Sequence, residues 1–331
     1  MELNNRKLKV LSLIAKEYLE SGEPVGSKTL VTLLGEAVSS ATIRNDMAEL
    51  ERMGLLFQPH TSAGRIPTAA GLRLYIERLM EKRKLSKQRR EFIDSLFLKS
   101  SSAQGAISLA SDALAEFSQC ASFSVSPADE NMRLKQIDFI KAGTNTLVFV
   151  LLTSTNIVKS VFVRLGGEIT SEALEALSNA SREKLHGIPL IDITPPFIQT
   201  MAAELCEYAF LLSPFFEALM DSVSELLVPG LFINGQDNLL RQQAGSLNAI
   251  KALNMLHSNE FLDYVNAGSG LAISFPEQSG VILYSGFRLS DDLFGSIGIL
   301  GPYRLDYSSI IPTIEYFSSS LENMLKQEFY K

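Results

Sequence analysis

Apolar residues at helical spacing predict a helix over residues 5 to 21, which Gly22 is placed to end. The inner side of this helix consists of Leu8, Leu11, Ile14 and Tyr18. After the connector EPVG, Ser27 can cap a short second helix that Gly35 closes. The inner side of the second helix consists of Leu30, Leu33 and Leu34. The pattern therefore predicts two helices set at an angle.

A third helix is predicted within SSATIRNDMAELERMG, residues 39 to 54. Ser39 or Ser40 can accept hydrogen bonds from its first free backbone amides. One side packs inward through Ile43, Met47, Leu50 and Gly54. The opposite side carries Ala41, Arg44, Asn45, Ala48 and Arg52, with Thr42 beside them. Small residues permit close approach and the polar ones can bond to base edges or phosphates, so this helix is suited to reading DNA.

The segment LLFQPHTSAGRIPT, residues 55 to 68, predicts a strand, a loop rich in turn-forming residues and a short return strand, which together make a β-wing. Thr68 can cap a further helix. The inner side of that helix consists of Leu72, Tyr75, Ile76 and Leu79. The basic stretch EKRKLSKQRRE, residues 81 to 91, then looks like a linker, and supplementary contact with a DNA backbone is the alternative for it.

The remainder of the chain alternates helical and strand-like segments. Helices are predicted over residues 103–118, 171–227, 247–265 and 310–327, with breaks in the second near Pro195, Pro196 and Pro214. Strands are predicted over residues 134–140, 146–153, 157–165, 271–275, 281–289 and 295–300, the first three as antiparallel neighbours. Strands on both sides of a long helical interval predict one sheet domain with an insertion. The fold class is α+β, with several domains.

Charge divides the chain more sharply than its net value of -7 suggests. Residues 1 to 90 carry 16 Lys and Arg against 10 Asp and Glu, and the rest of the chain carries 14 against 27. Phosphates would repel the acidic part. Only the basic front is therefore expected to approach a nucleic acid.

Other classes of protein receive no support from the composition. The longest apolar stretch, residues 146 to 152, is far short of the ~18 residues of a membrane span, and the amino terminus has no apolar signal core, so a cytoplasmic protein is expected. Cys120 and Cys206 form no paired motif, and the three histidines have no ligand-like spacing. We expect no metal, no cofactor and no enzyme active site.

Three motifs together resemble the HrcA family of heat-inducible transcription repressors. They are GEPVGSKTL, SSATIRNDMAELERMGLL and QPHTSAGRIPT, and the match is nearly unbroken from Gly22 to Thr68. GLFINGQDNLL (residues 230–240) and FGSIGILGPYRLDYSSIIP (residues 294–312) are similar to carboxy-terminal segments of that family. Residues 85 to 229 resemble it only in the order of elements.

The resemblance implies a winged helix-turn-helix head and a GAF-like α/β domain that carries an inserted, mainly helical dimerising domain. The corresponding boundaries are a head at 1–80, a basic linker at 81–102, a GAF-like domain at 103–168 and 268–331, and an insert at 169–267. Apolar residues of the insert offer a dimer surface, with a core of the insert itself as the alternative. They are Phe210, Leu211, Phe215, Phe216 and Leu219.

The family pattern of DNA-contacting residues is present in full. It falls on Ser39, Ser40, Thr42, Arg44 and Asn45 of the third helix and on His60, Thr61, Ser62 and Arg65 of the wing. For Arg44 and Asn45 the alternative is a solvated helix face. For Arg65 the alternatives to a phosphate contact are a narrow minor groove and an ion pair with a nearby carboxylate.

The expected protein is a homodimeric repressor that binds an inverted-repeat operator in double-stranded DNA. The resemblance further implies operators of heat-shock chaperone operons, inactivation by heat, and a chaperonin that favours the active fold. The rival hypothesis is a ligand-sensing regulator with the same head and a metabolite pocket in the GAF-like domain. A nucleic-acid enzyme would need metal-binding carboxylates that the sequence does not indicate.

Overall fold

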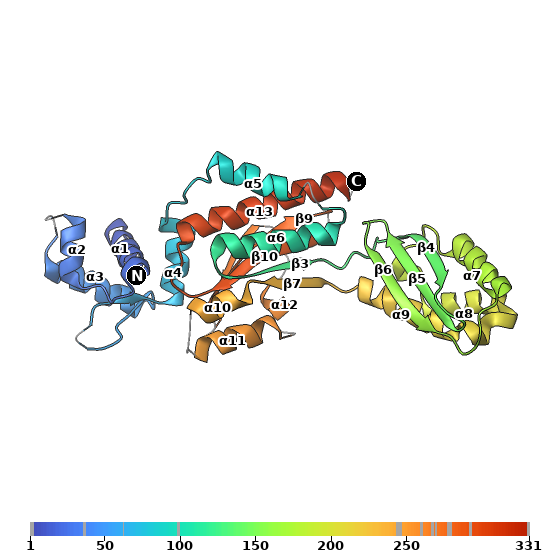
Figure 1. Cartoon of the computed structure of the whole chain (residues 1–331). Helices are drawn as coiled ribbons and strands as arrows, with labels where there is room; N and C mark the ends of the chain where they lie inside the picture. Colours follow the sequence, from blue (N-terminus) through green and yellow to red (C-terminus); the bar gives the residue numbers. More distant parts are fainter. Residues whose placement is uncertain are drawn as a thin grey trace.

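The computed structural model describes residues 3–35, 38–61, 63–97, 100–242, 247–258, 261–265, 268, 270–276, 280–290 and 293–329. The described residues form three units in a row (Figure 1). A helical head ends at residue 79. A central unit follows, built around a five-stranded sheet, and a distal unit at the far end holds a three-stranded sheet.

The head is helical apart from one short hairpin. Its elements are α1 (Asn5–Ser21), α2 (Ser27–Leu34), α3 (Ser40–Arg52), β1 (Leu56–Phe57), β2 (Ile66–Pro67), α4 (Ala69–Leu74) and the π-helical turn η1 (Tyr75–Leu79). Helix α1 ends at Gly22, which adopts a left-handed conformation with φ 79°. Thr68 accepts a hydrogen bond from the Gly71 amide and so caps α4. The predicted helices and hairpin of the head are confirmed.

One helix cap in the head differs from the prediction. Helix α2 begins after Gly26, and no side chain bonds to its first amides at that position. Ser27 is the first residue inside α2, and its hydroxyl lies against Ser40 of α3 instead. The prediction that Ser27 caps α2 was therefore wrong, because a cap residue must precede the helix.

The central unit has three layers, an antiparallel sheet with helices packed on both of its faces. Its strands are β3 (Ala121–Ser126), β7 (Gly230–Asn234), β8 (Gly270–Ser274), β9 (Val281–Arg288) and β10 (Phe294–Gly301), in the order β7-β3-β10-β9-β8. Its helices are α5 (Lys87–Phe97), α6 (Ala103–Ser118), α10 (Gln236–Gln242), α11 (Leu247–Leu256), α12 (Phe261–Tyr264) and α13 (Tyr307–Glu328).

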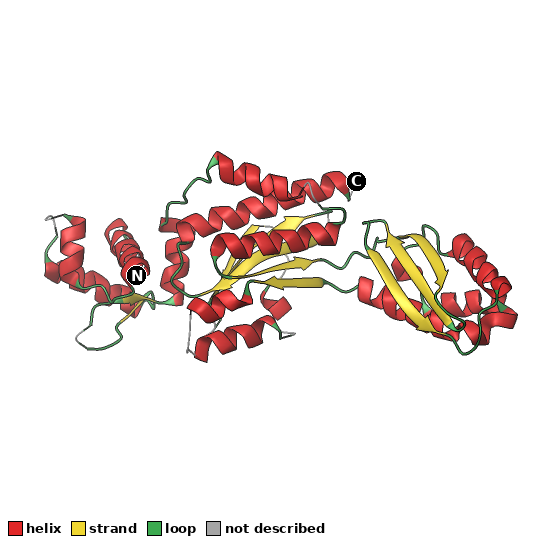
Figure 2. Cartoon of the chain, in the orientation of Figure 1, coloured by secondary structure: helices red, strands yellow, loops and turns green. Residues whose placement is uncertain are grey.

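Helices lie on both sides of this sheet (Figure 2), and the core residues of β9 alternate between the two sides. Val281 and Leu283 share a core with α5, α6 and α13, whereas Ile282 and Tyr284 share a second core with α10 to α12. Both faces of the sheet are therefore covered. This explains why β9 and β10 are buried along nearly their whole length rather than at every second residue.

The predicted basic linker is in part a packed helix. Helix α5 occupies half of residues 81 to 102, and its Ile93 and Phe97 are buried in the central core. Two basic residues before it bind the central unit, since Lys82 pairs with Glu315 and Arg83 pairs with Asp306. The stretch is thus tied to the body of the protein.

The distal unit corrects the predicted sheet. Its elements are β4 (Leu134–Lys141), β5 (Thr146–Thr153), β6 (Val158–Arg164), α7 (Ser171–Lys184), η2 (Leu190–Asp192), α8 (Pro195–Glu204), η3 (Cys206–Tyr208) and α9 (Ala209–Leu226). The three strands pair only with one another, and their inner face shares a core with α7, α8 and α9. They do not join the five-stranded sheet, so the insertion into that sheet begins before β4 and ends before β7. Pro214 lies inside α9 and does not break it.

The head and the central unit share part of one core. Ala15 of α1 and Tyr75 and Ile76 of η1 belong to the same buried cluster as Tyr307 and Ile311 of α13. At the rim of this joint the Arg304 guanidinium donates a hydrogen bond to the Glu20 carbonyl at the end of α1, with an Nη2–O distance of 3.2 Å. Among the described residues, no helix has the length and apolar character needed to cross a membrane.

Candidate nucleic-acid interface

Helix α3 separates its buried and exposed sides as the sequence predicts, except that Gly54, expected on the buried side, lies beyond the end of the helix and is exposed. Ile43, Met47 and Leu50 are buried in the head core. On the opposite side Arg44 and Asn45 are exposed. The helix therefore presents to solvent the two residues that were predicted to read bases.

The start of α3 is held by its own hydroxyl groups. The Ser39 hydroxyl accepts a hydrogen bond from the Thr42 amide at 3.1 Å and lies 2.9 Å from the Thr42 hydroxyl. Ser40 follows as the first helical residue. Since the remaining amides of a helix N-terminus attract anions, these three residues lie where a phosphate would be favoured.

The Arg44 side chain is tethered within the head. Its Nε donates a hydrogen bond to the Ser27 hydroxyl at 3.2 Å, and the same hydroxyl lies 3.0 Å from the Ser40 hydroxyl. Ser27 itself is only 9% exposed. Arg44 and Ser40, both predicted to contact DNA, therefore share Ser27 as a hydrogen-bond partner. From the sequence, Ser27 was predicted to cap α2.

The loop between β1 and β2 displays the other predicted residues. His60 and Thr61 are exposed at its tip, and Ser62 lies outside the described residues. The Gln58 side chain donates to the carbonyls of Thr61 and Ala63, both at 3.0 Å. These two hydrogen bonds of Gln58 could not be predicted from the sequence, because they depend on the path of the loop.

Arg65 lies at the base of the loop and is engaged by a carboxylate. Its guanidinium donates to Glu51 of α3, with an Nε–Oε2 distance of 3.0 Å and an Nη2–Oε2 distance of 2.9 Å. Its backbone exchanges two hydrogen bonds with Val25. A Cβ atom on the neighbouring Gly64 would lie 2.3 Å from the Val25 carbonyl oxygen, so this close approach requires glycine. The structure therefore contains the ion pair that was given as an alternative for Arg65 in the sequence analysis.

Two ion pairs hold α3 against α1. Arg6 donates to both carboxylate oxygens of the buried Asp46, at 2.6 and 3.0 Å, and Lys7 pairs with Glu49. The hydrogen bond from Lys7 lowers the pKa of Glu49, and the bond to Asp46 raises the pKa of Arg6. Buried Asp46 was not anticipated, because in the sequence it reads as a polar residue on a helix.

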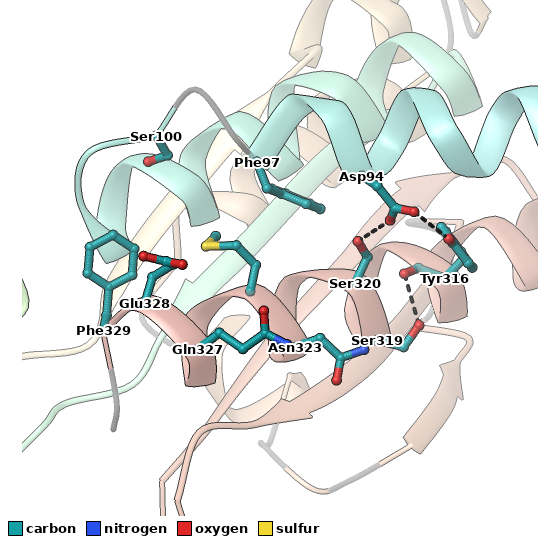
Figure 3. Close-up of a pocket in the computed structure, with 11 residues that line it drawn as sticks. Asp94, Phe97, Ser100, Tyr316, Ser319, Ser320, Asn323, Gln327, Glu328 and Phe329 are labelled. Atoms are coloured by element: carbon teal, nitrogen blue, oxygen red, sulfur yellow. Dashed lines mark hydrogen bonds between the residues drawn. The ribbon is translucent and has the colours of Figure 1, made fainter.

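Three hollows of the surface are lined by residues outside α3. One of about 570 Å³ opens between α5 and α13, where Asp94 accepts hydrogen bonds from Tyr316 and Ser320 (Figure 3). Burial, and then the bond to Asp94, raise the pKa of Tyr316. Within the described part of the chain, no three His, Cys, Asp or Glu side chains cluster as metal ligands would.

Comparison with known proteins gives a consistent family. The family described as HrcA protein C terminal domain matches residues 104–311. A protein of Ruminiclostridium cellulolyticum named heat-inducible transcription repressor HrcA is 30% identical over 350 residues, which cover 100% of this chain and 99% of that protein. The protein of the same name from Lachnoclostridium phytofermentans is 29% identical over 346 residues, 99% of each chain.

A solved structure supports the fold alone. A crystal structure described as a hypothetical protein at 2.2 Å resolution has a TM-score of 0.66 and 22% identity, and it covers 99% of this chain and 100% of that one.

The sequence relatives are named as transcription repressors and not as enzymes, which confirms the expected class of protein, a transcription repressor. Because the family match spans most of the chain and the relatives align from end to end, this chain belongs to the HrcA family.

Proposed function

We propose that this chain is a heat-inducible repressor of chaperone operons, which binds an inverted-repeat operator as a homodimer. The observation that carries the proposal is the exposed side of α3, where Arg44 and Asn45 are open to solvent and lie outside the head core. A helix inserted in the major groove can read guanine with arginine and adenine with asparagine. A repressor of bacterial operons acts in the cytoplasm.

The head is proposed to be a winged helix-turn-helix. Helices α2 and α3, with the connection between them, form the helix-turn-helix. The β1–β2 loop forms the wing, with His60 and Thr61 at its tip. Ser39, Ser40 and Thr42 would bond to the phosphate backbone beside the groove. For Arg65 a phosphate contact stays a prediction, and it requires the guanidinium to bond to a phosphate while it pairs with Glu51.

The central unit is proposed to be GAF-like and the distal unit to be its inserted dimerising domain. The antiparallel five-stranded sheet with helices on both faces supports the first assignment. The self-contained core of the distal unit supports the second. With strand pairing taken into account, the insert covers about residues 127–229 in place of the 169–267 expected from sequence.

The dimer surface is proposed to be the outer face of the three-stranded sheet. Of the five residues considered for this role, Phe215, Phe216 and Leu219 are buried in the core of the distal unit, Leu211 is partly buried against it, and Phe210 is 87% exposed on α9. On the outer face, strand register aligns Ile140, Val148 and Phe162 in one row and Leu152 beside Val158 in another. Ile140, Val158 and Phe162 are 56%, 65% and 75% exposed. Between these rows the register aligns Asp138, Val150 and Ser160, so the face combines exposed apolar and polar side chains. Exposed apolar residues grouped in this way mark an interaction site, and a two-fold operator calls for a second copy of the chain.

Heat and a chaperonin complete the proposal. We expect heat to open the central or distal unit reversibly, and a chaperonin to return the chain to its active fold. During stress, unfolded substrates compete for the chaperonin, so less active repressor remains. No small molecule is needed in this scheme.

The decisive experiment is footprinting of the purified chain on the promoter of a chaperone operon from its source genome. The proposal expects two protected half-sites related by two-fold symmetry, and loss of protection on heating. The ligand-sensing alternative expects a metabolite to change the binding instead. No protection at any chaperone promoter would reject the proposed function.

A further inference from the structure

The hydroxyl of Ser27 joins two side chains that are candidates for DNA contact. It lies on the first residue of α2, is nearly buried, and meets Arg44 at 3.2 Å and Ser40 at 3.0 Å. It makes no cap for its own helix. Its position between α2 and α3 therefore calls for another explanation.

The directions of these hydrogen bonds follow from the chemistry of the groups. A guanidinium can only donate, so the Ser27 oxygen accepts from Arg44 Nε. The single proton of Ser27 is then available for the Ser40 oxygen. In that arrangement the proton of Ser40 remains available for an external acceptor at the start of α3.

We propose that Ser27 is a positioning residue for base readout, a role that rests on the proposed function. With Nε held by Ser27, the two terminal nitrogens of Arg44 remain available for the O6 and N7 acceptors of guanine. Arg44 is exposed and would otherwise sample many rotamers, which binding must restrict. The tether restricts them before DNA arrives and so strengthens operator binding selectively.

A purely structural role for Ser27 makes a different prediction. If its hydroxyl only fastened α2 to α3, its loss would weaken the head as a whole. Binding to every DNA sequence would then fall alike, and the effect would not depend on Arg44. The two roles are therefore separable by a double-mutant cycle.

The experiment uses full-length Ser27→Ala, Arg44→Ala and the double variant, titrated on the footprinted operator and on a shuffled duplex of equal length. Ser12→Ala, a serine on α1 that lines a hollow with η1 and residues 304–308, is the matched control. We expect Ser27→Ala to weaken operator binding about tenfold, which is ~1.4 kcal/mol, and to leave shuffled DNA unchanged. In the Arg44→Ala background we expect it to have no further effect, and the control to have none at all.

Arginine-selective ¹⁵N labelling tests the tether without DNA. We expect the Nε–H signal of Arg44 to exchange slowly with water in the parent chain and rapidly in Ser27→Ala. Additive losses in the cycle, equal losses on both duplexes, or an unchanged Nε–H signal would overturn the positioning role. If the parent chain itself does not prefer the operator, the proposed function fails and the specificity role falls with it, whatever the Nε–H signal shows.

Discussion

Replacement of Phe162 by alanine tests the proposed dimer directly. Phe162 lies on β6 with 75% of its surface exposed, beside Val148 and in one row with Ile140. Nothing within the described chain uses this ring for its core, since it belongs to none of the buried clusters. The substitution should therefore spare the fold and weaken only association.

The size of the effect follows from the exposed fraction. Full burial of a phenylalanine is worth ~1.5 to 3 kcal/mol, so burial of the exposed three quarters is worth ~1 to 2 kcal/mol. A two-fold interface contains each residue twice, which gives ~2 to 4 kcal/mol for the dimer. The dissociation constant of the dimer should rise roughly 30- to 1,000-fold.

The assay is sedimentation of the full-length chain over a range of micromolar concentrations, with circular dichroism to verify the fold. Phe210→Ala is the matched control, because Phe210 is 87% exposed but lies on α9, which packs on the inner face of the same sheet. A Phe162→Ala chain that dimerises like the parent, or an equal loss in Phe210→Ala, would refute the sheet face as the dimer surface. A monomeric parent chain would remove the dimer altogether.

Three further predictions concern the head. Arg44→Ala and Asn45→Ala should each cost ~1 to 3 kcal/mol on the operator and little on random DNA, as measured by titration on both; equal losses would leave only phosphate contact. Arg65→Ala should weaken binding to all sequences and lower the salt slope by about one, as the loss of one phosphate contact predicts, whereas Glu51→Gln should leave the slope unchanged; an unchanged slope in Arg65→Ala, with equal weakening in Glu51→Gln, would leave Arg65 only its pairing with Glu51. The pKa of Glu49 is lowered from its ordinary value of 4.5, so its ion pair with Lys7 stabilises the head above that pH and is lost in acid. Glu49→Gln should therefore reduce the fall of the melting temperature as the pH is lowered. An unchanged fall would contradict this.

The head could be predicted from sequence because its signals are local. Helical spacing, the Thr68 cap and the terminating Gly22 each act within a few residues. The roles of Ser27, Glu51 and Asp46 could not be predicted in this way. Each depends on a partner 14 to 40 residues away, which only the packing of the helices brings close.

The body was harder to predict because strand pairing is not local. Three strand-like segments were recognised at 134–165, but nothing in their pattern states which sheet they join. β3, whose ASFSVS sequence alternates serine with apolar residues, was not predicted. In the structure the hydroxyls of Ser122 and Ser124 bond to carbonyls of α6, so these serines are buried on a helix-covered face.

The sharing of a core between head and central unit suggests where heat acts. Residues of α1, α2 and α3 form a compact cluster of their own, which includes Leu11, Leu30 and Leu50. Ala15 of α1 and Tyr75 and Ile76 of η1 instead share a buried cluster with α13, and Arg304 bonds to the end of α1 at this joint. Loosening of the central unit would therefore leave the reading surface of α3 folded but free the head from its fixed position. In the proposed dimer, heads that are not held at a fixed distance would fit the two half-sites together less well, so we expect operator affinity to fall before the head itself unfolds.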